Sequence, residues 1–278
     1  MKSTAASKVR GTLGVIGVGT IGNAIIEGLI NNDTMKSSQI VGSTAHQVTA
    51  EKASEKLNIE ILTDNKTLVR KSDFLLLAVK PQVMAVVTEE IGKLVTEEQL
   101  IISVAAAVET NYIESRLKSK VAVIRAMPNT PVTVNEGITV LCPGQLATED
   151  DIELARKLFT PVGRVKLLQE EQLMNAVTGL SGSGPAYGYL IIEALIEAGV
   201  KVGLPRQLAT TLASQSLLGA AKMVLATGEH PAMLKDMVTT PAGTTVDGIM
   251  KLEEGGVRVA MIKAIVKATE KAEELNLR

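Results

Sequence analysis

Close to the start of the chain, a short apolar run leads directly into three spaced glycines and then into a helical pattern. The sequence Thr12-Leu-Gly-Val-Ile-Gly-Val-Gly-Thr-Ile-Gly22 places Gly17, Gly19 and Gly22 in the spacing G-x-G-x-x-G. In a strand-turn-helix unit, these glycines allow the tight turn, the approach of a pyrophosphate and close helix-strand packing. The feature predicts a dinucleotide-binding (Rossmann) domain, and the alternative is a purely structural turn.

Short apolar runs then alternate with helical patterns through the first half of the chain. This alternation is typical of parallel strands joined by crossover helices. Consecutive apolar residues indicate strands that are covered on both faces. The expected strands are Leu13–Ile16, Ile40–Gly42, Ile59–Leu62, Phe74–Val79, Leu100–Val104 and Val121–Ala126. We therefore expect a doubly wound α/β domain.

The second half of the chain reads as helical. Helices are expected from Ser183 to about Gly199, from Pro205 to about Thr227 and from about Arg258 to Leu275. The predicted organisation is a dinucleotide-binding domain over residues 1–170, followed by an all-helical domain over residues 171–278. Small residues between Ala209 and Ala226 permit close helix-helix contact and favour an intimate helical assembly.

The composition excludes several classes of protein. A net charge of -1, from 29 basic and 30 acidic residues, gives no support for nucleic-acid or anionic-membrane binding. We see neither a membrane span nor a signal peptide, and we expect a cytoplasmic location. Cys142 is the only cysteine and the two histidines lie far apart, so we expect neither an internal disulfide nor a metal site.

The end of the second expected strand indicates the type of dinucleotide. An acidic residue there would bind the ribose hydroxyls of NAD, but this chain has Ser43-Thr44-Ala45-His46. Two hydroxyls and backbone amides could hold a 2′-phosphate, with His46 nearby, which favours NADP. The arginine that often completes such a site is missing, and the alternative is a solvated loop that binds NAD indifferently.

Two further loops follow expected strands and should border the cofactor, because ligands of such sheets lie outside the carboxyl ends of the strands. These loops are Ala78-Val-Lys-Pro81 and Val104-Ala-Ala106. Alternatively, Lys80 is a solvated lysine and the alanine pair a packing turn. Asn65, after the third strand, contacts the ligand or caps a helix.

A threonine-rich segment precedes another helical pattern in the second half. Leu234-Lys-Asp-Met-Val-Thr-Thr-Pro-Ala-Gly-Thr-Thr-Val-Asp247 holds four threonines, a proline and a glycine. Its amides and hydroxyls could surround a small anion such as a carboxylate. The alternative is a plain helix cap, which would need one threonine.

Taken together, these motifs resemble the pyrroline-5-carboxylate reductases of proline biosynthesis. The resemblance covers nearly the whole chain, and the segment from Asp236 to Thr245 looks like the family signature. The other matching motifs are the glycine fingerprint, Ala78-Val-Lys-Pro81, Met127-Pro-Asn-Thr-Pro131 and Val177-Thr-Gly-Leu-Ser-Gly-Ser-Gly-Pro-Ala-Tyr187. The resemblance implies helices that interlock with a second subunit, giving homodimers that often assemble into decamers of five dimers.

The resemblance also implies site residues, motif by motif. Substrate contacts fall on Glu171, Thr240, Gly243, Thr244 and Thr245, with Thr245 as the catalytic residue that hydrogen-bonds the ring nitrogen. Two residues depart from the family pattern: Ala242 stands where glycine is usual, and Met237 where a polar residue is frequent. Cofactor contacts fall on Ile16, Gly17, Val18, Gly19, Thr20, Ile21, Gly22, Ser43, Thr44, Asn65, Ala78, Val79, Lys80, Pro81, Val104, Ala105 and Ala106.

The implied reaction is reduction of L-1-pyrroline-5-carboxylate to L-proline with NADP(H), NAD(H) being possible. Such a hydride transfer needs little beyond alignment of two bound reactants, which fits the lack of a catalytic His, Cys or Asp constellation. A β-hydroxyacid dehydrogenase would need a catalytic lysine near residues 173–178, and this segment contains no lysine. A silent dinucleotide sensor would have no reason to keep the threonine-rich loop.

Overall fold

The computed structural model describes residues 8–276, and the chain forms two compact units. The first unit comprises Met1–Ser183 with Lys267–Arg278, and the second comprises Gly184–Val266. The division by compactness thus falls at Ser183, while the domain boundary expected near residue 170 stays a prediction.

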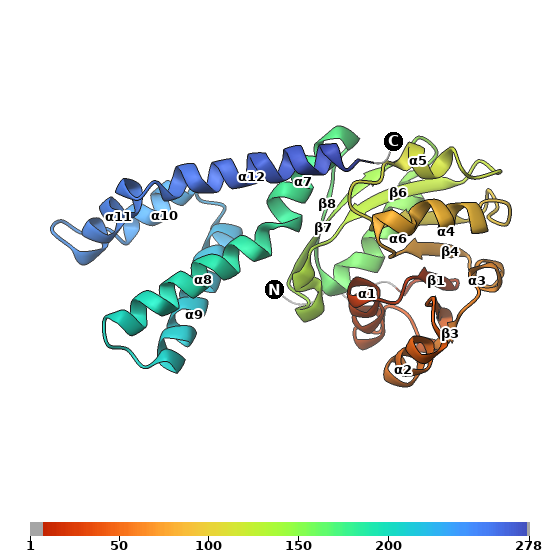
Figure 1. Ribbon diagram of the computed structural model, residues 1–278, viewed down its shortest axis with the longest axis horizontal. Helices are drawn as coiled ribbons and strands as arrows, with labels where there is room; N and C mark the ends of the chain where they lie inside the picture. Colours follow the sequence, from red (N-terminus) through yellow and green to blue (C-terminus); the bar gives the residue numbers. More distant parts are fainter. Residues whose placement is uncertain (1–7, 277–278) are drawn as a thin grey trace. The chain divides into compact units, whose positions relative to one another are not determined.

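One eight-stranded sheet forms the centre of the first unit in its described residues (Figure 1). The strand order is β3-β2-β1-β4-β5-β6-β7-β8. All neighbours are parallel except β6 and β7, so the last two strands run against the other six. The strands are β1 (Leu13–Ile16), β2 (Ile40–Ser43), β3 (Glu60–Leu62), β4 (Phe74–Leu77), β5 (Leu100–Ser103), β6 (Ala122–Met127), β7 (Gly137–Pro143) and β8 (Gly163–Leu167).

Helices cover both faces of this sheet, which explains the consecutive apolar residues in its strands. Along β4, Phe74 and Leu76 belong to one buried cluster, whereas Leu75 and Leu77 belong to another. The first cluster includes residues of α1 (Thr20–Asn31), α2 (Gln47–Leu57) and α6 (Glu149–Phe159), and the second those of α3 (Asn65–Lys71), α4 (Met84–Ile91) and α5 (Thr110–Glu114). The doubly wound fold is therefore confirmed.

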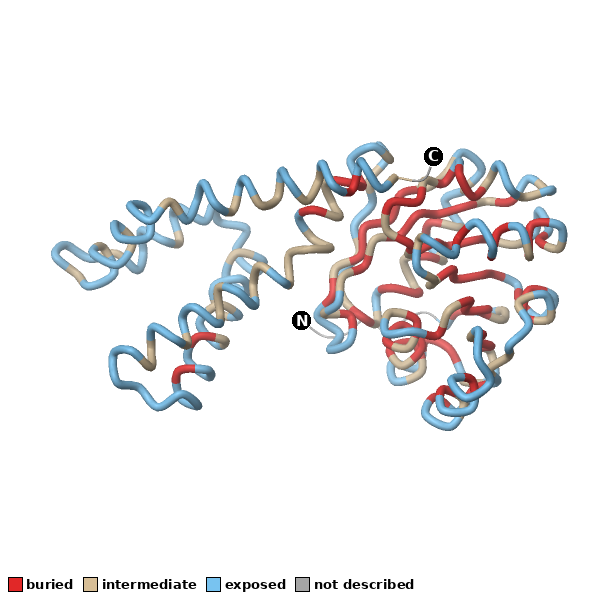
Figure 2. Tube along the Cα trace, viewed as in Figure 1, coloured by how far each residue is buried: buried red, intermediate tan, exposed pale blue. Residues whose placement is uncertain are grey.

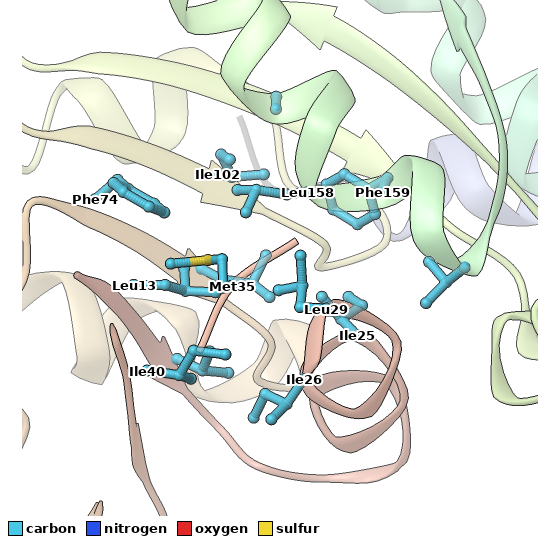
Figure 3. Packing of buried hydrophobic residues seen from close by; sticks show 14 of the residues in the cluster. Leu13, Ile25, Ile26, Leu29, Met35, Ile40, Phe74, Ile102, Leu158 and Phe159 are labelled. Atoms are coloured by element: carbon cyan, nitrogen blue, oxygen red, sulfur yellow. The ribbon is translucent and has the colours of Figure 1, made fainter. Parts of the chain in front are cut away.

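Close packing of aliphatic side chains holds the first cluster together. Leu29 of α1 and Leu158 of α6 point into the same cluster as Leu13 of β1 (Figure 3). All three side chains are at most 1% exposed. Burying such a side chain contributes about 1.5–3 kcal/mol each.

The second unit consists of helices, as expected. In chain order its elements are α8 (Gly184–Lys201), α9 (Arg206–Thr227), α10 (Pro231–Met237), α11 (Thr244–Glu254) and the start of α12 (Val257–Glu274). Ahead of them, in the first unit, lie the short helix α7 (Met174–Val177) and a π-helical turn, Thr178–Gly182.

Most residues of the helical unit are exposed (Figure 2), and these include most of its large apolar residues. Within residues 184–266, only Ala209 and Ala213 of α9 are buried. Leu190, Met237 and Ile262 are 65%, 75% and 57% exposed. A single copy of this unit therefore has almost no core of its own, and its apolar stripes need a further partner surface. In residues 8–276 no helix has the length and apolar character needed to cross a membrane.

Two strands and one helix add to the expectation. The strands β7 and β8 add to the six that the sequence indicated, and α10 precedes the turn of the threonine-rich segment, whereas α11 is the helical pattern that was expected after it. Strand β8 carries alternating polar residues and has no buried position, so it lacks the apolar run that marked the others. Strand β7 has that run, bounded by Gly137 and Pro143.

Candidate functional site

Four strands of the sheet end side by side at one edge. Ser43 of β2, Ile16 of β1, Leu77 of β4 and Ser103 of β5 pair with one another in register. The loops after these strands therefore start next to one another, and they contain most of the predicted cofactor residues. The chain goes outward from β1 to β3 and then returns to β4, so this edge includes the topological switch point at which such sheets bind ligands.

The three glycines after β1 differ in whether the fold itself requires a glycine at that position. Gly17 has φ of +96°, and a Cβ there would lie 2.8 Å from the Ala78 carbonyl oxygen and from Val79 Cγ1. A Cβ on Gly22 would lie 2.6 Å from the carbonyl oxygen of Gly17. The fold thus requires both of these glycines.

Gly19 is different, because nothing lies within 4 Å of a Cβ built there. Its φ of -96° is open to any residue. No contact within the chain accounts for a glycine at this position, but the close approach of a bound molecule would. The loop therefore fits a dinucleotide, as the sequence motif indicated.

The start of α1 provides donors for an anion. Gly19 is the N-cap residue and no side chain caps the helix, so the first amides have no partner from the helix itself. Gly19 and Thr20 are exposed. The first turn contains no acidic residue that would compete with a phosphate at the positive end of the helix dipole.

Ser43 and Asn65 lie in direct contact. The Ser43 hydroxyl donates to Asn65 Oδ1 at 2.6 Å, and Ser43 is only 1% exposed. Asp64, not Asn65, caps α3, because its carboxylate accepts from the amides of Lys66 and Thr67. The alternative of Asn65 as a helix cap is therefore wrong.

The structure also changes the proposed grip on a 2′-phosphate. The Ser43 hydroxyl donates its hydrogen bond to Asn65. The hydroxyl of the half-buried Thr44 donates to the carbonyl oxygen of His46 at 3.2 Å. Both hydroxyl donors are thus engaged within the chain. The backbone donors that stay available next to them are the first amides of α2, which His46 precedes without a side-chain cap.

The remaining two cofactor loops differ in exposure. Lys80 is exposed and precedes the short 3₁₀ helix Pro81–Val83, while Val79 is half-buried against Gly17. Ala105 is buried, whereas Val104 and Ala106 are half-buried. These exposures are compatible with cofactor contact, and the solvated lysine and the packing turn stay open as alternatives.

Glu171 makes several contacts inside the first unit. Its carboxylate accepts from the Thr110 amide at 2.8 Å and from the Thr110 hydroxyl at 2.7 Å. Oε1 also lies 3.5 Å from Nη1 of Arg125, whose side chain is 2% exposed and whose Nη2 donates to Asn175 Oδ1 at 3.4 Å. Glu171 is thus the counter-ion of a buried guanidinium, and its substrate contact stays a prediction.

The electrostatics around this ion pair follow from burial. Burial lowers the pKa of Arg125, and the charge and hydrogen bonding of Glu171 oppose this effect. Burial also raises the pKa of the Cys142 thiol to about 11, with the charge of Glu171 adding to the shift. The Arg125–Glu171 pair was not predicted from the sequence, although an arginine inside the apolar run of residues 121–127 indicates a buried charge that needs a partner.

The threonine-rich segment spans the end of α10, the turn after it and the start of α11 in the helical unit. Gly243 is the N-cap residue of α11 and no threonine side chain caps the helix, so the simple capping interpretation is wrong. A Cβ on Gly243 would lie 2.4 Å from Thr240 Oγ1. Thr244 and Thr245 are exposed at the first turn of the helix, where free amides favour an anion.

Both departures from the family pattern have structural consequences. Ala242 adopts φ of +56°, a left-handed conformation that costs an alanine about 1–2 kcal/mol. Met237 lines an apolar cavity of about 560 Å³ between α9 and α10, together with Met223, Val224 and Leu234. It therefore extends an apolar surface instead of offering a polar group.

A second cavity, in the first unit, lies away from the predicted cofactor loops. A cavity of about 770 Å³ in the first unit is lined by Thr12, Ile40 and Glu60 at the opposite, amino edge of the sheet. Within residues 8–276, no group of three or more His, Cys, Asp and Glu side chains could hold a metal ion.

Comparisons with known proteins match both parts of the chain. Residues 171–275 match the family model for pyrroline-5-carboxylate reductase dimerisation, and residues 12–107 match the model for NADP oxidoreductase, coenzyme F420-dependent. The pyrroline-5-carboxylate reductase of Methanosarcina acetivorans is 44% identical over 263 residues, covering 95% of this chain and 97% of that protein. That of Glycine max is 41% identical over 265 residues, covering 95% and 96%.

Solved structures agree with these relatives. A pyrroline-5-carboxylate reductase from Coxiella burnetii superposes with a TM-score of 0.89 at 36% identity, covering 96% of this chain and 99% of that one. The Plasmodium falciparum pyrroline carboxylate reductase with NADP bound gives a TM-score of 0.88 at 28% identity, covering 98% and 100%.

Proposed function

Because this chain belongs to the pyrroline-5-carboxylate reductase family, we propose that it reduces L-1-pyrroline-5-carboxylate to L-proline with NADPH, the last step of proline biosynthesis. The near full-length match to relatives of that name carries the proposal. The open space at Gly19, beside uncapped helix amides, supports a dinucleotide at the carboxyl edge of the sheet.

The residues of this chain have binding and orienting roles in the proposed mechanism. Bound NADPH would supply a hydride to the imine carbon. With the ring nitrogen already protonated, the electron pair of the C=N bond moves to that nitrogen and the product is the neutral amine. The hydroxyls of Thr240 and Thr244 and the amide of Thr244 hold the substrate carboxylate at the start of α11, and Gly243, whose own amide donates to the Thr240 carbonyl oxygen at 2.9 Å, leaves room for it beside the turn. Thr245 hydrogen-bonds the ring nitrogen and so orients the imine for transfer.

NADPH is the proposed cofactor, with NADH as a possible second one. No acidic side chain stands at positions 43–46, so nothing at the end of β2 repels a 2′-phosphate. The NADP oxidoreductase model over residues 12–107 and the NADP in the Plasmodium falciparum structure support this choice. The contacts come from the loops after β1, β2, β3, β4 and β5.

A homodimer is the proposed unit of assembly, with a decamer of five dimers as a further possibility. The exposed apolar stripes of the helical unit and the dimerisation model over residues 171–275 support self-association. Light scattering at micromolar concentration should show a dimer or a multiple of dimers. A stable monomer would contradict this part of the proposal, and the cytoplasmic location stays a prediction.

The direct test follows the loss of reduced-cofactor absorbance on addition of the cyclic imine, with NADPH and NADH offered separately. Thr245→Ala should lower kcat/KM by an amount equivalent to about 2–3 kcal/mol of lost transition-state stabilisation, the range for an orienting hydrogen bond to a charged group. It should leave NADPH binding unchanged. Thr245→Ser should recover most of the loss. Absence of imine-dependent oxidation with both nucleotides would refute the proposed function, and wild-type kinetics of Thr245→Ala would refute the role of Thr245.

A further inference from the structure

A chain of three polar side chains connects the end of β2 to helix α4. The Ser43 hydroxyl donates to Asn65 Oδ1 at 2.6 Å, and Asn65 Nδ2 donates to Glu90 Oε2 at 2.7 Å. Ser43 ends β2, Asn65 begins α3 and Glu90 lies in the last turn of α4. Ser43 and Asn65 were predicted to contact the cofactor, whereas Glu90 is not among the predicted site residues.

Glu90 determines which way the Asn65 amide faces. An amide presents an oxygen acceptor on one side and an NH2 donor on the other, whereas an ionised carboxylate can only accept. With Glu90 on one side, the NH2 group must point to it, so the oxygen turns toward the Ser43 hydroxyl. The hydrogen bond to a carboxylate is also stronger than one between neutral groups. One Asn65 N–H then stays available for a ligand.

Ser43 transmits this orientation to the glycine-rich loop. Its carbonyl oxygen accepts from the amides of Gly17 and Val18, at 3.0 and 3.1 Å. The same residue leads into the β2–α2 turn, where folds of this class contact the adenosine ribose of a dinucleotide. Both nucleotide-facing turns therefore depend on Ser43, whose side chain is held by Asn65.

We propose that Glu90 is a positioning residue for nucleotide binding, acting through Asn65 on Ser43 without contacting the nucleotide. This inference rests on the proposed function for the location of the nucleotide. It assigns Glu90 to affinity and not to hydride transfer, because its effect is on the end of β2, where the adenosine ribose is expected.

The test measures the Kd of NADPH by fluorescence titration in the absence of the imine, for the full-length protein and three single variants. Glu90→Ala should raise Kd about tenfold, the effect of about one lost hydrogen bond, and leave kcat at saturating NADPH unchanged. Glu90→Gln keeps an acceptor oxygen for Asn65 but adds an NH2 donor and loses the charge, so it should fix the Asn65 amide less strictly and give a Kd between those of wild type and Glu90→Ala. Glu89→Ala is the matched control, since Glu89 is an exposed glutamate of the same helix.

A double-mutant cycle separates positioning from a general loss of stability. Asn65→Ala alone should weaken NADPH binding, and adding Glu90→Ala should cause no further loss, because the path through Asn65 is already broken. An additive second loss would overturn the inference, as would a wild-type Kd for Glu90→Ala or an equal loss in Glu89→Ala. A Glu90→Gln variant that binds NADPH more weakly than Glu90→Ala would overturn it too.

These outcomes are distinct from failure of the proposed function. If the wild-type protein binds NADPH and shows no imine turnover, the proposed reaction fails, and the comparison of Kd values still decides the role of Glu90. If wild-type protein binds NADPH and Glu90→Ala binds it equally well, only the inference fails. A wild-type protein that binds neither NADPH nor NADH would refute both.

Discussion

Replacement of Glu171 by alanine should destabilise the first unit strongly, because it leaves Arg125 buried without its counter-ion. The Arg125 side chain is 2% exposed, and its other polar contact is the 3.4 Å hydrogen bond to Asn175. A guanidinium does not lose its proton in proteins, so the charge stays in place. Removing one partner of a buried ion pair costs about 3–5 kcal/mol.

The same substitution removes the acceptor for two donors of Thr110, which is 4% exposed. A buried donor left unpaired costs about 1–3 kcal/mol. The two costs overlap, because the carboxylate serves both partners, so we expect a total near the upper end of the first range, about 5 kcal/mol. Arg125→Met added to Glu171→Ala should recover part of the loss, since the uncompensated charge disappears.

Urea unfolding measures this cost, at one fixed protein concentration because self-association changes apparent stability. Glu170→Ala is the matched control, as Glu170 is the exposed neighbour on the same segment. Glu171→Ala should have a much lower midpoint than Glu170→Ala, with the double variant in between. A wild-type midpoint together with a raised KM for the imine would refute the structural role and make Glu171 a substrate ligand.

Two further predictions concern the glycine loop and the buried thiol. Gly17→Ala should lower the melting temperature, because the new Cβ collides with Ala78 and Val79 and the backbone φ is +96°. Gly19→Ala should keep the wild-type melting temperature and weaken NADPH binding, because nothing in the chain lies close to its Cβ. Equal melting temperatures for the two variants would contradict this distinction. Burial raises the pKa of Cys142 from 9.0 to about 11, so its contribution to the free energy of unfolding is present below pH 9.0 and is lost as the pH rises through about 11. Unfolding titrations of wild type and Cys142→Ala across this range should show the extra decline in the wild type alone, and parallel curves would contradict the shift.

The fold was predictable where local pattern and tertiary environment agree. Strands covered on both faces have uninterrupted apolar residues, so β1 and β4 could be located from sequence alone. Strand β8 is partly exposed and polar, and it pairs with β7 at the edge of the sheet, which local sequence does not encode. The threonine-rich segment was visible, but the short helix α10 before it was not.

Contacts between side chains of different motifs were not predicted from the sequence. The contacts of Glu171 with Arg125 and of Asn65 with Glu90 join residues that are 46 and 25 positions apart. Such pairs arise when the sheet brings separate loops together. An arginine within an apolar strand signals that a partner exists, but it does not identify the partner.

The glycine loop shows how a motif can support a functional inference. Gly17 and Gly22 are needed by the fold itself, since side chains there would collide with the Ala78 and Gly17 carbonyl oxygens. A chain that had lost its nucleotide would still need both of them. Gly19 has no steric or conformational reason within the chain, so it is the member of the motif whose presence argues for a bound molecule. Of the three glycines, only Gly19 indicates a bound dinucleotide, and it lies at the exposed start of α1, where such a molecule could reach it.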